Sequence, residues 1–140
     1  MDKTIAPSRQ LILPEMYELL LELAKNRDIV IVSGQTVEKI KWQSNNLPAI
    51  IMGQNGNQAV DLHGAELWHF PLADDHRQEI LAHIEKLREI IDHEINEDWN
   101  PVEDRGAQIT FSPIGNTAPV EKKIPYDPDM KKRLKMIQTV

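Results

Sequence analysis

Polar side chains that could bind a charged group follow two apolar segments of this sequence. Ser33 comes directly after the apolar run 29–32, and Asn55 follows the apolar run 49–52. Open α/β sheets bind their ligands at the carboxyl ends of their parallel strands. We therefore predict that Ser33 and Asn55 lie close together at that edge of one sheet, with the hydroxyl of Thr4 beside them. Ser-Gly and Asn-Gly pairs also form plain turns, which is the alternative for the first two positions.

The first third of the chain alternates helix and strand patterns. Residues 11–26 and 37–44 have apolar side chains at helical spacing, and Thr36 can cap the second of these helices. Residues 28–32 and 49–52 are short and continuously apolar, as buried parallel strands are. The order helix, strand, helix, strand is typical of a parallel sheet with crossover helices.

The pattern then changes to hairpins around one long helix. The elements expected here are a hairpin over 58–70, a helix over 75–97 capped by Asp74 or Asp75, a hairpin over 102–111 around Gly106, and a final basic helix over 127–138. The fold class that we predict is α/β, with parallel strands in a Rossmann-like core and an α+β cap that contains an antiparallel sheet. The expected domains are 1–57 as a partial core, 58–124 as the cap, and 125–140 as the start of the return to the core.

Four segments resemble, in order, the motifs of the haloacid dehalogenase (HAD) superfamily, in the phosphatase and phosphomutase branch that includes eukaryotic phosphomannomutases. They are 1–4, 30–36, 52–56 and 102–116. The first is similar to the family motif D-x-D-x-T, with Asp2 on the second Asp and Thr4 on the Thr. The nucleophilic first Asp of that motif would stand one position before Met1. By itself this segment can equally be a frayed chain end.

The second and third segments carry the groups that hold the substrate in this family. Ser33 matches the hydroxyl residue of the second motif, so the resemblance implies that Ser33 and Gly34 bind the phosphoryl group. The third motif is Glu-Asn-Gly in similar enzymes and Gln-Asn-Gly here. It implies that Asn55 and Gly56 bind the substrate, with Gln54 replacing the family's Glu.

The fourth segment is the most specific match, because it resembles the phosphomannomutase cap with its Ser-Pro-Ile-Gly-Arg run. Arg105 falls on the first substrate-binding Arg, and Asn116 stands where the second Arg is expected. A guanidinium suits a substrate phosphate through paired hydrogen bonds. Because Asn116 lacks that charge, we expect hydrolysis rather than mutase action. The alternative for Arg105 is a surface pair with Glu103 or Asp104.

The resemblance implies a Mg²⁺-dependent hydrolase of sugar phosphates or similar phosphomonoesters, or a phosphomutase, acting through an aspartyl-phosphate. Asp2 would be the acid/base group and a Mg²⁺ ligand, with Thr4 beside it. The family's acidic metal cluster would lie beyond Val140, so we expect residues 1–140 to lack part of the active site. The alternative functions are an inactive HAD-like binding or interaction module and, third, an unrelated α/β domain.

The composition of the chain indicates which binding partners and which cellular location to expect. The formal net charge of -6 opposes binding to nucleic acid or to anionic membranes, and the chain has no cysteine for disulfides or thiolate chemistry. No apolar run approaches the roughly 20 residues of a membrane span, so a cytoplasmic protein is expected. The expected partner is a small phosphorylated substrate, with a homodimer through the cap as a further option. We expect the histidines to lie at the surface and the basic run 131–135 to be a solvated helix face.

Overall fold

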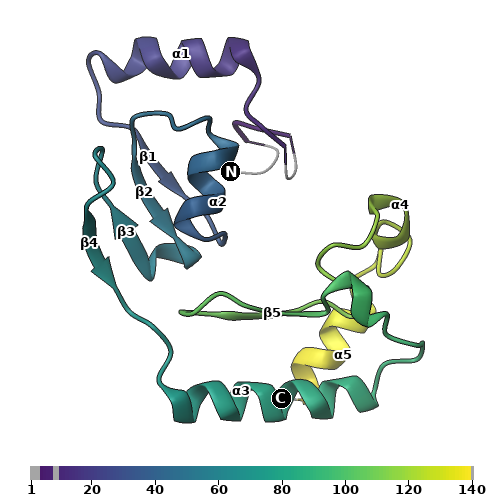
Figure 1. The fold of residues 1–140 in the computed structure, drawn as a ribbon. Helices are drawn as coiled ribbons and strands as arrows, with labels where there is room; N and C mark the ends of the chain where they lie inside the picture. Colours follow the sequence, from purple (N-terminus) through teal and green to yellow (C-terminus); the bar gives the residue numbers. More distant parts are fainter. Residues whose placement is uncertain (1–3, 8–9, 140) are drawn as a thin grey trace. The chain divides into compact units, whose positions relative to one another are not determined.

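The computed structural model describes residues 4–7 and 10–139. The chain divides into two compact units, Met1–Pro71 and Leu72–Val140, and each has its own sheet (Figure 1). The first sheet contains a parallel strand pair and the second is antiparallel. The expected mixture of α/β and α+β structure is therefore confirmed.

The first unit is built on a four-stranded sheet of order β1-β2-β3-β4. Its elements are α1 (Pro14–Ala24), β1 (Val30–Val32), α2 (Val37–Gln43), β2 (Ile50–Gly53), the 3-10 turn η1 (Gln54–Gly56), β3 (Gln58–Val60) and β4 (Glu66–His69). Strands β1 and β2 run parallel, with Ile31 opposite Ile51. This confirms the parallel pair with a crossover helix that the apolar runs predicted.

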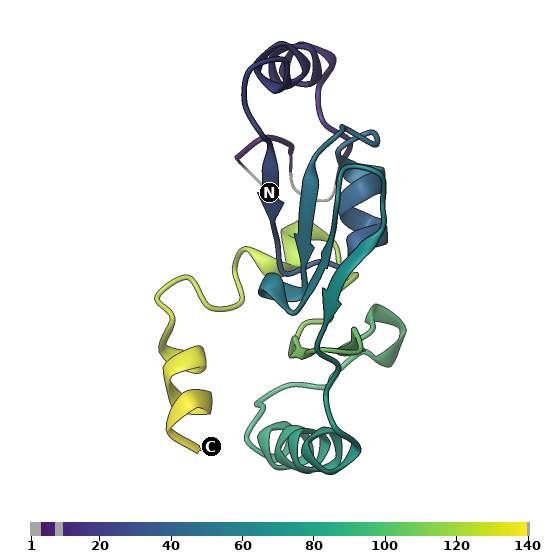
Figure 2. The same ribbon diagram turned by 90° about the vertical axis from the view of Figure 1, so that its left-hand side faces the viewer.

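Helix α2 lies against one face of this sheet (Figure 2). Thr36 caps it as expected, because its Oγ1 accepts from the N–H of Lys39 at 3.4 Å. The apolar side chains between helix and sheet form the core of the unit, namely Ile31, Val37, Ile40, Leu47, Ala49, Ile51 and Val60. This core fixes where both parallel strands end, and so fixes the position of the loops that follow them.

The chain divides between Pro71 and Leu72 rather than after residue 57, where the expected core ended. The reason is strand pairing, because β3 continues the first sheet antiparallel to β2, with Gly53 opposite Gln58. The hairpin at 58–70 was expected as the first part of a cap. In the structure it belongs to the same sheet as the parallel strands.

The second unit contains a long helix and a two-stranded sheet. Its elements are α3 (Asp74–Glu89), the 3-10 turn η2 (Glu97–Trp99), β5 (Val102–Asp104), β6 (Ile109–Phe111), α4 (Val120–Lys123) and α5 (Lys131–Thr139). The β5–β6 turn is tied to the start of α3, where Leu72 N–H donates to Gly106 O at 2.9 Å and Arg77 pairs with Asp104. No helix among the described residues has the length and apolar composition that crossing a membrane requires.

Helix α3 is shorter than the predicted 75–97. It begins at Asp74 after Ala73, which makes no side-chain cap, and it ends at Glu89. Arg88 then holds the returning chain by donating to Glu97, with 2.5 Å between Nη1 and Oε1. The apolar residues after Glu89 thus lie outside the helix even though their spacing continues the helical pattern.

Candidate functional site

The loops after β1 and β2 meet at the carboxyl ends of the two strands. Ser33 N–H donates to Met52 O at 3.0 Å, and Asn55 N–H donates back to Ser33 O at 2.9 Å. A third backbone bond of 2.8 Å joins Gln54 N–H to Gln35 O. The structure therefore brings Ser33 and Asn55 together at the sheet edge where the sequence placed them.

The side chains of this loop pair are arranged around Gly34. Ser33 Oγ accepts from the N–H of Gln35 at 3.3 Å, which leaves its own hydrogen to point elsewhere. A Cβ atom on Gly34 would lie 3.3 Å from Asn55 Oδ1, so the Asn55 amide covers this glycine closely. The Ser33 hydroxyl and the Asn55 amide thus lie on either side of the backbone at Gly34, which has no side chain.

The chain after β2 adopts an uncommon backbone conformation. Gln54, Asn55 and Gly56 have φ values of 52°, 60° and 97°. Left-handed geometry is strained for residues other than glycine, although Asn tolerates it better than most. Burial of Gln54 and the hydrogen bond from Trp68 Nε1 to Gly56 O at 2.9 Å hold the turn in place. Strained backbone of this kind is concentrated at functional sites.

Gly53 allows the two loops to approach so closely. A Cβ atom at this position would lie 2.9 Å from Val37 N and 3.0 Å from Gln35 O. Both neighbours are backbone atoms, which cannot move without shifting the loop or the start of α2. Glycine at position 53 is thus a geometric requirement of the site.

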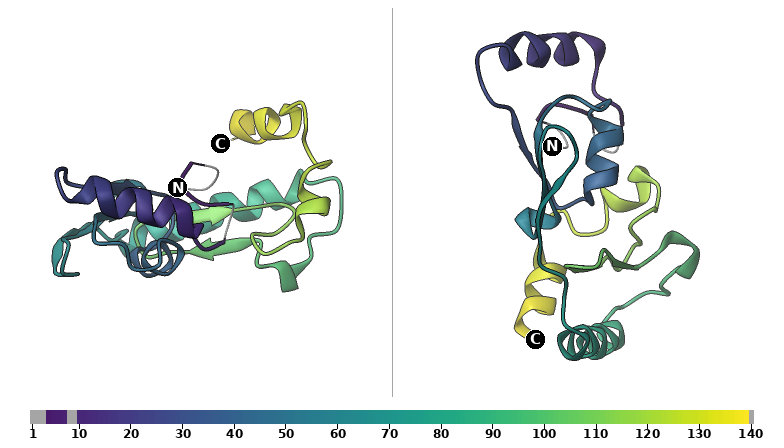
Figure 3. Two further views of the ribbon diagram at one scale, coloured as in Figure 1. Left: turned by 90° about the horizontal axis from the view of Figure 1, so that it is seen from above. Right: turned by 60° about the vertical axis from the view of Figure 1, so that its left-hand side comes forward.

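The structure does not bring Thr4 to Ser33. The described segment 4–7 lies near the C-terminal end of α2 (Figure 3), where Gln43 Nε2 donates to Pro7 O at 3.3 Å, whereas Ser33 precedes the N-terminal end of the same helix. The N–H of Ile12 also donates to Gln43 O at 2.8 Å, so the buried Gln43 holds both sides of the segment. Asp2 lies outside the described residues, and its expected acid/base and metal roles with it.

Arg105 of the second unit has a largely buried side chain. Its side chain is 8% exposed, and Nη2 donates to Glu103 Oε2 at 2.7 Å. Pairing with Glu103 was the alternative to substrate binding, but the pair is buried rather than on the surface. Burial makes the pair part of the hairpin structure, because neither charge could be left alone there cheaply.

Asn116 is also buried, and its contacts are to main chain. Its Nδ2 donates to Asn100 O at 3.0 Å and its N–H donates to the same oxygen at 3.0 Å. The preceding Gly115, at φ 101°, packs so closely that any side chain would overlap Trp99. The segment that resembles the phosphomannomutase cap is therefore bound tightly to the loop before β5.

The described residues do not form a recognisable metal centre. Among residues 4–7 and 10–139, no group of three or more His, Asp or Glu side chains could hold a metal ion. The carboxylates that the resemblance assigns to Mg²⁺ thus have no counterpart in the described part of the chain. Neither a scan against protein-family models nor a search of curated proteins finds a match for this sequence.

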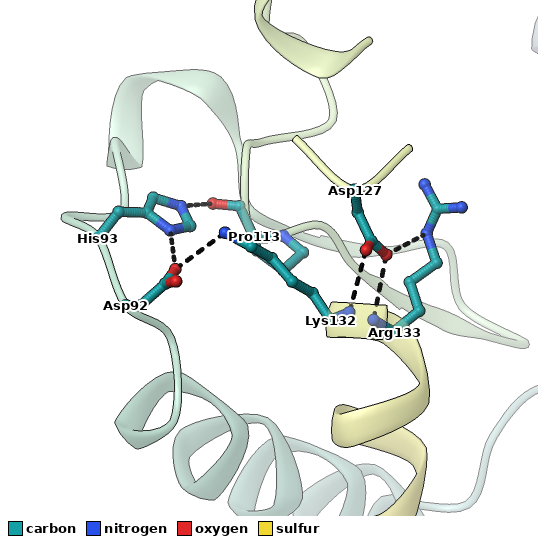
Figure 4. Close-up of polar contacts among 6 residues, drawn as sticks. All are labelled: Asp92, His93, Pro113, Asp127, Lys132 and Arg133. Atoms are coloured by element: carbon teal, nitrogen blue, oxygen red, sulfur yellow. Dashed lines mark hydrogen bonds and ion pairs between the residues drawn. The ribbon is translucent and has the colours of Figure 1, made fainter. Parts of the chain in front are cut away.

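Sequence patterns missed a polar cluster where α5 meets the loop after α3, within the second unit (Figure 4). His93 was expected at the surface but is half-buried, with Nδ1 3.3 Å from Asp92 Oδ1 and Nε2 3.2 Å from Pro113 O. Lys132 Nζ donates to Asp92 at 3.1 Å and lies 4.6 Å from the centre of the Tyr126 ring. The cluster joins segments around residues 92–93, 113 and 126–132, which are far apart in sequence and form no motif. Only the fold could therefore reveal it.

The same cluster fixes the start of α5 and shifts two ionisation equilibria. Buried Asp127 accepts from the N–H groups of Lys132 and Arg133 at 3.0 and 3.1 Å. The hydrogen bond from Lys132, followed by that from His93, lowers the pKa of Asp92. Burial, followed by the charges of Asp92 and Asp127, raises the pKa of Tyr126. The cluster therefore anchors helix α5 within the second unit.

Proposed function

We propose that the loop pair formed by residues 33–36 and 54–56 binds the phosphoryl group of a small phosphomonoester such as a sugar phosphate. The observation that carries the proposal is the convergence of the Ser33 hydroxyl and the Asn55 amide over Gly34. Both groups follow adjacent parallel strands, at the sheet edge where α/β folds bind ligands. The hydroxyl of Ser33 can donate to a phosphate oxygen while its own oxygen accepts from Gln35.

The resemblance to HAD phosphatases supports the same assignment, since Ser33, Gly34, Asn55 and Gly56 are the residues that it names. It would make this loop pair the phosphoryl-binding part of a phosphotransferase. Turnover in that family also needs an aspartyl nucleophile, and the motif match gives this role to no residue of the sequence. Thr4 is outside the loop pair, and the described residues offer no Mg²⁺ site, so we propose no catalytic step through either.

The test is a titration with inorganic phosphate and a panel of sugar phosphates, followed through the backbone amide signals of Ser33, Gly34 and Asn55. A hydrogen bond to a charged group stabilises by about 1.5–3 kcal/mol. We therefore expect Ser33→Ala to weaken phosphate binding roughly tenfold or more. Thr117→Ala removes an exposed hydroxyl of the second unit and is the matched control. Equal affinity of wild type and Ser33→Ala would disprove the proposal.

A second candidate function is a binding module without catalysis. The remote position of segment 4–7 favours it, because the acid/base motif would have to lie beside Ser33 in an active enzyme. A Mg²⁺-dependent phosphatase assay on the 140-residue chain distinguishes the two functions. We expect phosphate binding without turnover. Turnover abolished by Asp2→Asn would show that the chain is an enzyme and that the nucleophile was misassigned.

A further inference from the structure

Helix α1 presents two different faces. Tyr17, Leu20 and Leu21 pack against the core of the first unit. On the opposite side Leu19 and Leu23 are 62% and 48% exposed, one helical turn apart. The exposed acidic residues beside them are Glu15, Glu18 and Glu22. The outer face of α1 is thus a short apolar stripe with negative charge along it.

Helix α5 has the reverse arrangement of charge. Its inner side carries Lys132, which contacts Asp92 and the ring of Tyr126. On its outer side Leu134 and Ile137 are 53% and 70% exposed, again about one turn apart. The exposed basic residues beside them are Lys131, Arg133 and Lys135. The outer face of α5 is therefore an apolar stripe of similar length with positive charge along it.

We propose that α1 of one copy of this chain packs on α5 of a second copy. Each face offers two apolar side chains about one turn apart, and the opposite charges beside them favour this pairing in the way that charges flanking a coiled-coil seam set partner choice. Like charges oppose the pairings of α1 with α1 and of α5 with α5, so the charges select the mixed pair. In this proposal a second copy of the chain covers the exposed faces of both α1 and α5.

The exposed ion pairs within each helix region do not prevent this association. Glu22 pairs with Lys25, and Lys131 lies 2.8 Å from Asp129 through its Nζ. All four side chains are more than half exposed, and surface pairs of this kind stabilise little. They can exchange partners at small cost, while burial of the leucine and isoleucine side chains supplies the attraction.

Charge reversal with mixing is the decisive experiment. One variant carries Glu18→Lys and Glu22→Lys in α1, and the other carries Lys131→Glu and Lys135→Glu in α5. Sedimentation equilibrium over a concentration series should show association of the wild type and a dissociation constant weakened roughly tenfold or more in either variant alone. An equimolar mixture of the two variants should associate again, because each variant's unchanged helix faces an opposite charge on the other.

The controls separate this contact from others. Glu79→Lys with Glu89→Lys changes two exposed charges on α3 and should leave association unchanged. Leu134→Gln should weaken association while the circular dichroism spectrum keeps its helical shape, because this side chain is mostly exposed. A wild type that is monomeric at every concentration would overturn the proposal. Mixed variants that stay monomeric would overturn it as well.

Discussion

The backbone N–H of Asn55 donates to the carbonyl oxygen of Ser33 across 2.9 Å. This bond joins two loops that follow neighbouring parallel strands, and a second bond from Gln54 to Gln35 reinforces it. The main chain therefore holds the Ser33 hydroxyl and the Asn55 amide in place. Side-chain substitutions at these two positions should change binding without moving the loops.

Substitution of Asn55 separates its backbone role from its side-chain role. Its φ of 60° is easy for glycine and unfavourable for alanine. We expect Asn55→Ala to lower the free energy of unfolding by about 1 kcal/mol and Asn55→Gly to change it less. Both should weaken phosphate binding, since both lose the amide. Urea unfolding and the phosphate titration measure the two effects, and full binding by Asn55→Gly would show that the amide plays no part.

Gly53, at the end of β2, and Gly34, in the loop pair, should respond differently to alanine. The added Cβ of Gly53→Ala meets backbone atoms of Val37 and Gln35 at 2.9 and 3.0 Å. Overpacking of this kind typically costs about 1–3 kcal/mol, so the variant should be clearly less stable. The nearest atoms to an added Cβ in Gly34→Ala belong to the Asn55 side chain, at 3.3 Å and beyond, so this variant should mainly weaken phosphate binding. Thermal unfolding and phosphate titration of both variants measure the two effects. A larger loss of stability in Gly34→Ala than in Gly53→Ala would contradict the prediction.

The sequence predicted the parallel pair from two continuously apolar runs, but it overestimated their burial, because β1 is an edge strand that buries Ile31 and leaves Val30 and Val32 about half exposed. Ile31 and Ile51 belong to short apolar runs, and such runs end where the sheet ends. This is also why Ser33 and Asn55 could be placed at one edge. The position of the 58–70 hairpin could not be predicted, because alternating residues show that a hairpin forms and do not show which strand it joins.

The parts of the site that the sequence misjudged depend on long-range contacts. Thr4 lies away from Ser33 because Gln43, at the end of α2, binds the backbone of Pro7, and a glutamine in a helix gives no sign of such a role. Asn116 was compared with a substrate-binding arginine, but its amide reaches main-chain oxygens that come close only in the folded chain. Helix α3 also ends earlier than predicted, and the chain after it turns back so that Glu97 pairs with Arg88, a contact that helical spacing does not reveal.

Burial of the Arg105–Glu103 pair predicts a loss of stability when one partner is removed. Both side chains are at least 85% buried, so Arg105→Ala leaves a carboxylate without its cation in a poorly hydrated place. We expect a loss of about 2–4 kcal/mol. The double variant Arg105→Met with Glu103→Gln should lose less than the sum of the two single changes. Additive losses in a double-mutant cycle by urea unfolding would show that the two side chains act independently.

Acid should weaken the attachment of α5 through Asp92. The hydrogen bond from Lys132 holds the pKa of this carboxyl below its ordinary 3.8 in the folded chain. A carboxyl whose pKa is lower when folded stabilises the fold above its unfolded pKa, and it loses that contribution as the pH falls through the folded value. The contribution should therefore be complete at pH 6 and decline progressively below about pH 4.

Wild type should unfold at a higher temperature than Asp92→Asn at pH 6, and the difference should shrink toward pH 3. Glu94→Gln, at an exposed carboxylate on the same loop, is the matched control variant. A difference between wild type and Asp92→Asn that stays constant from pH 6 to pH 3 would mean that the ionised Asp92 does not anchor the helix.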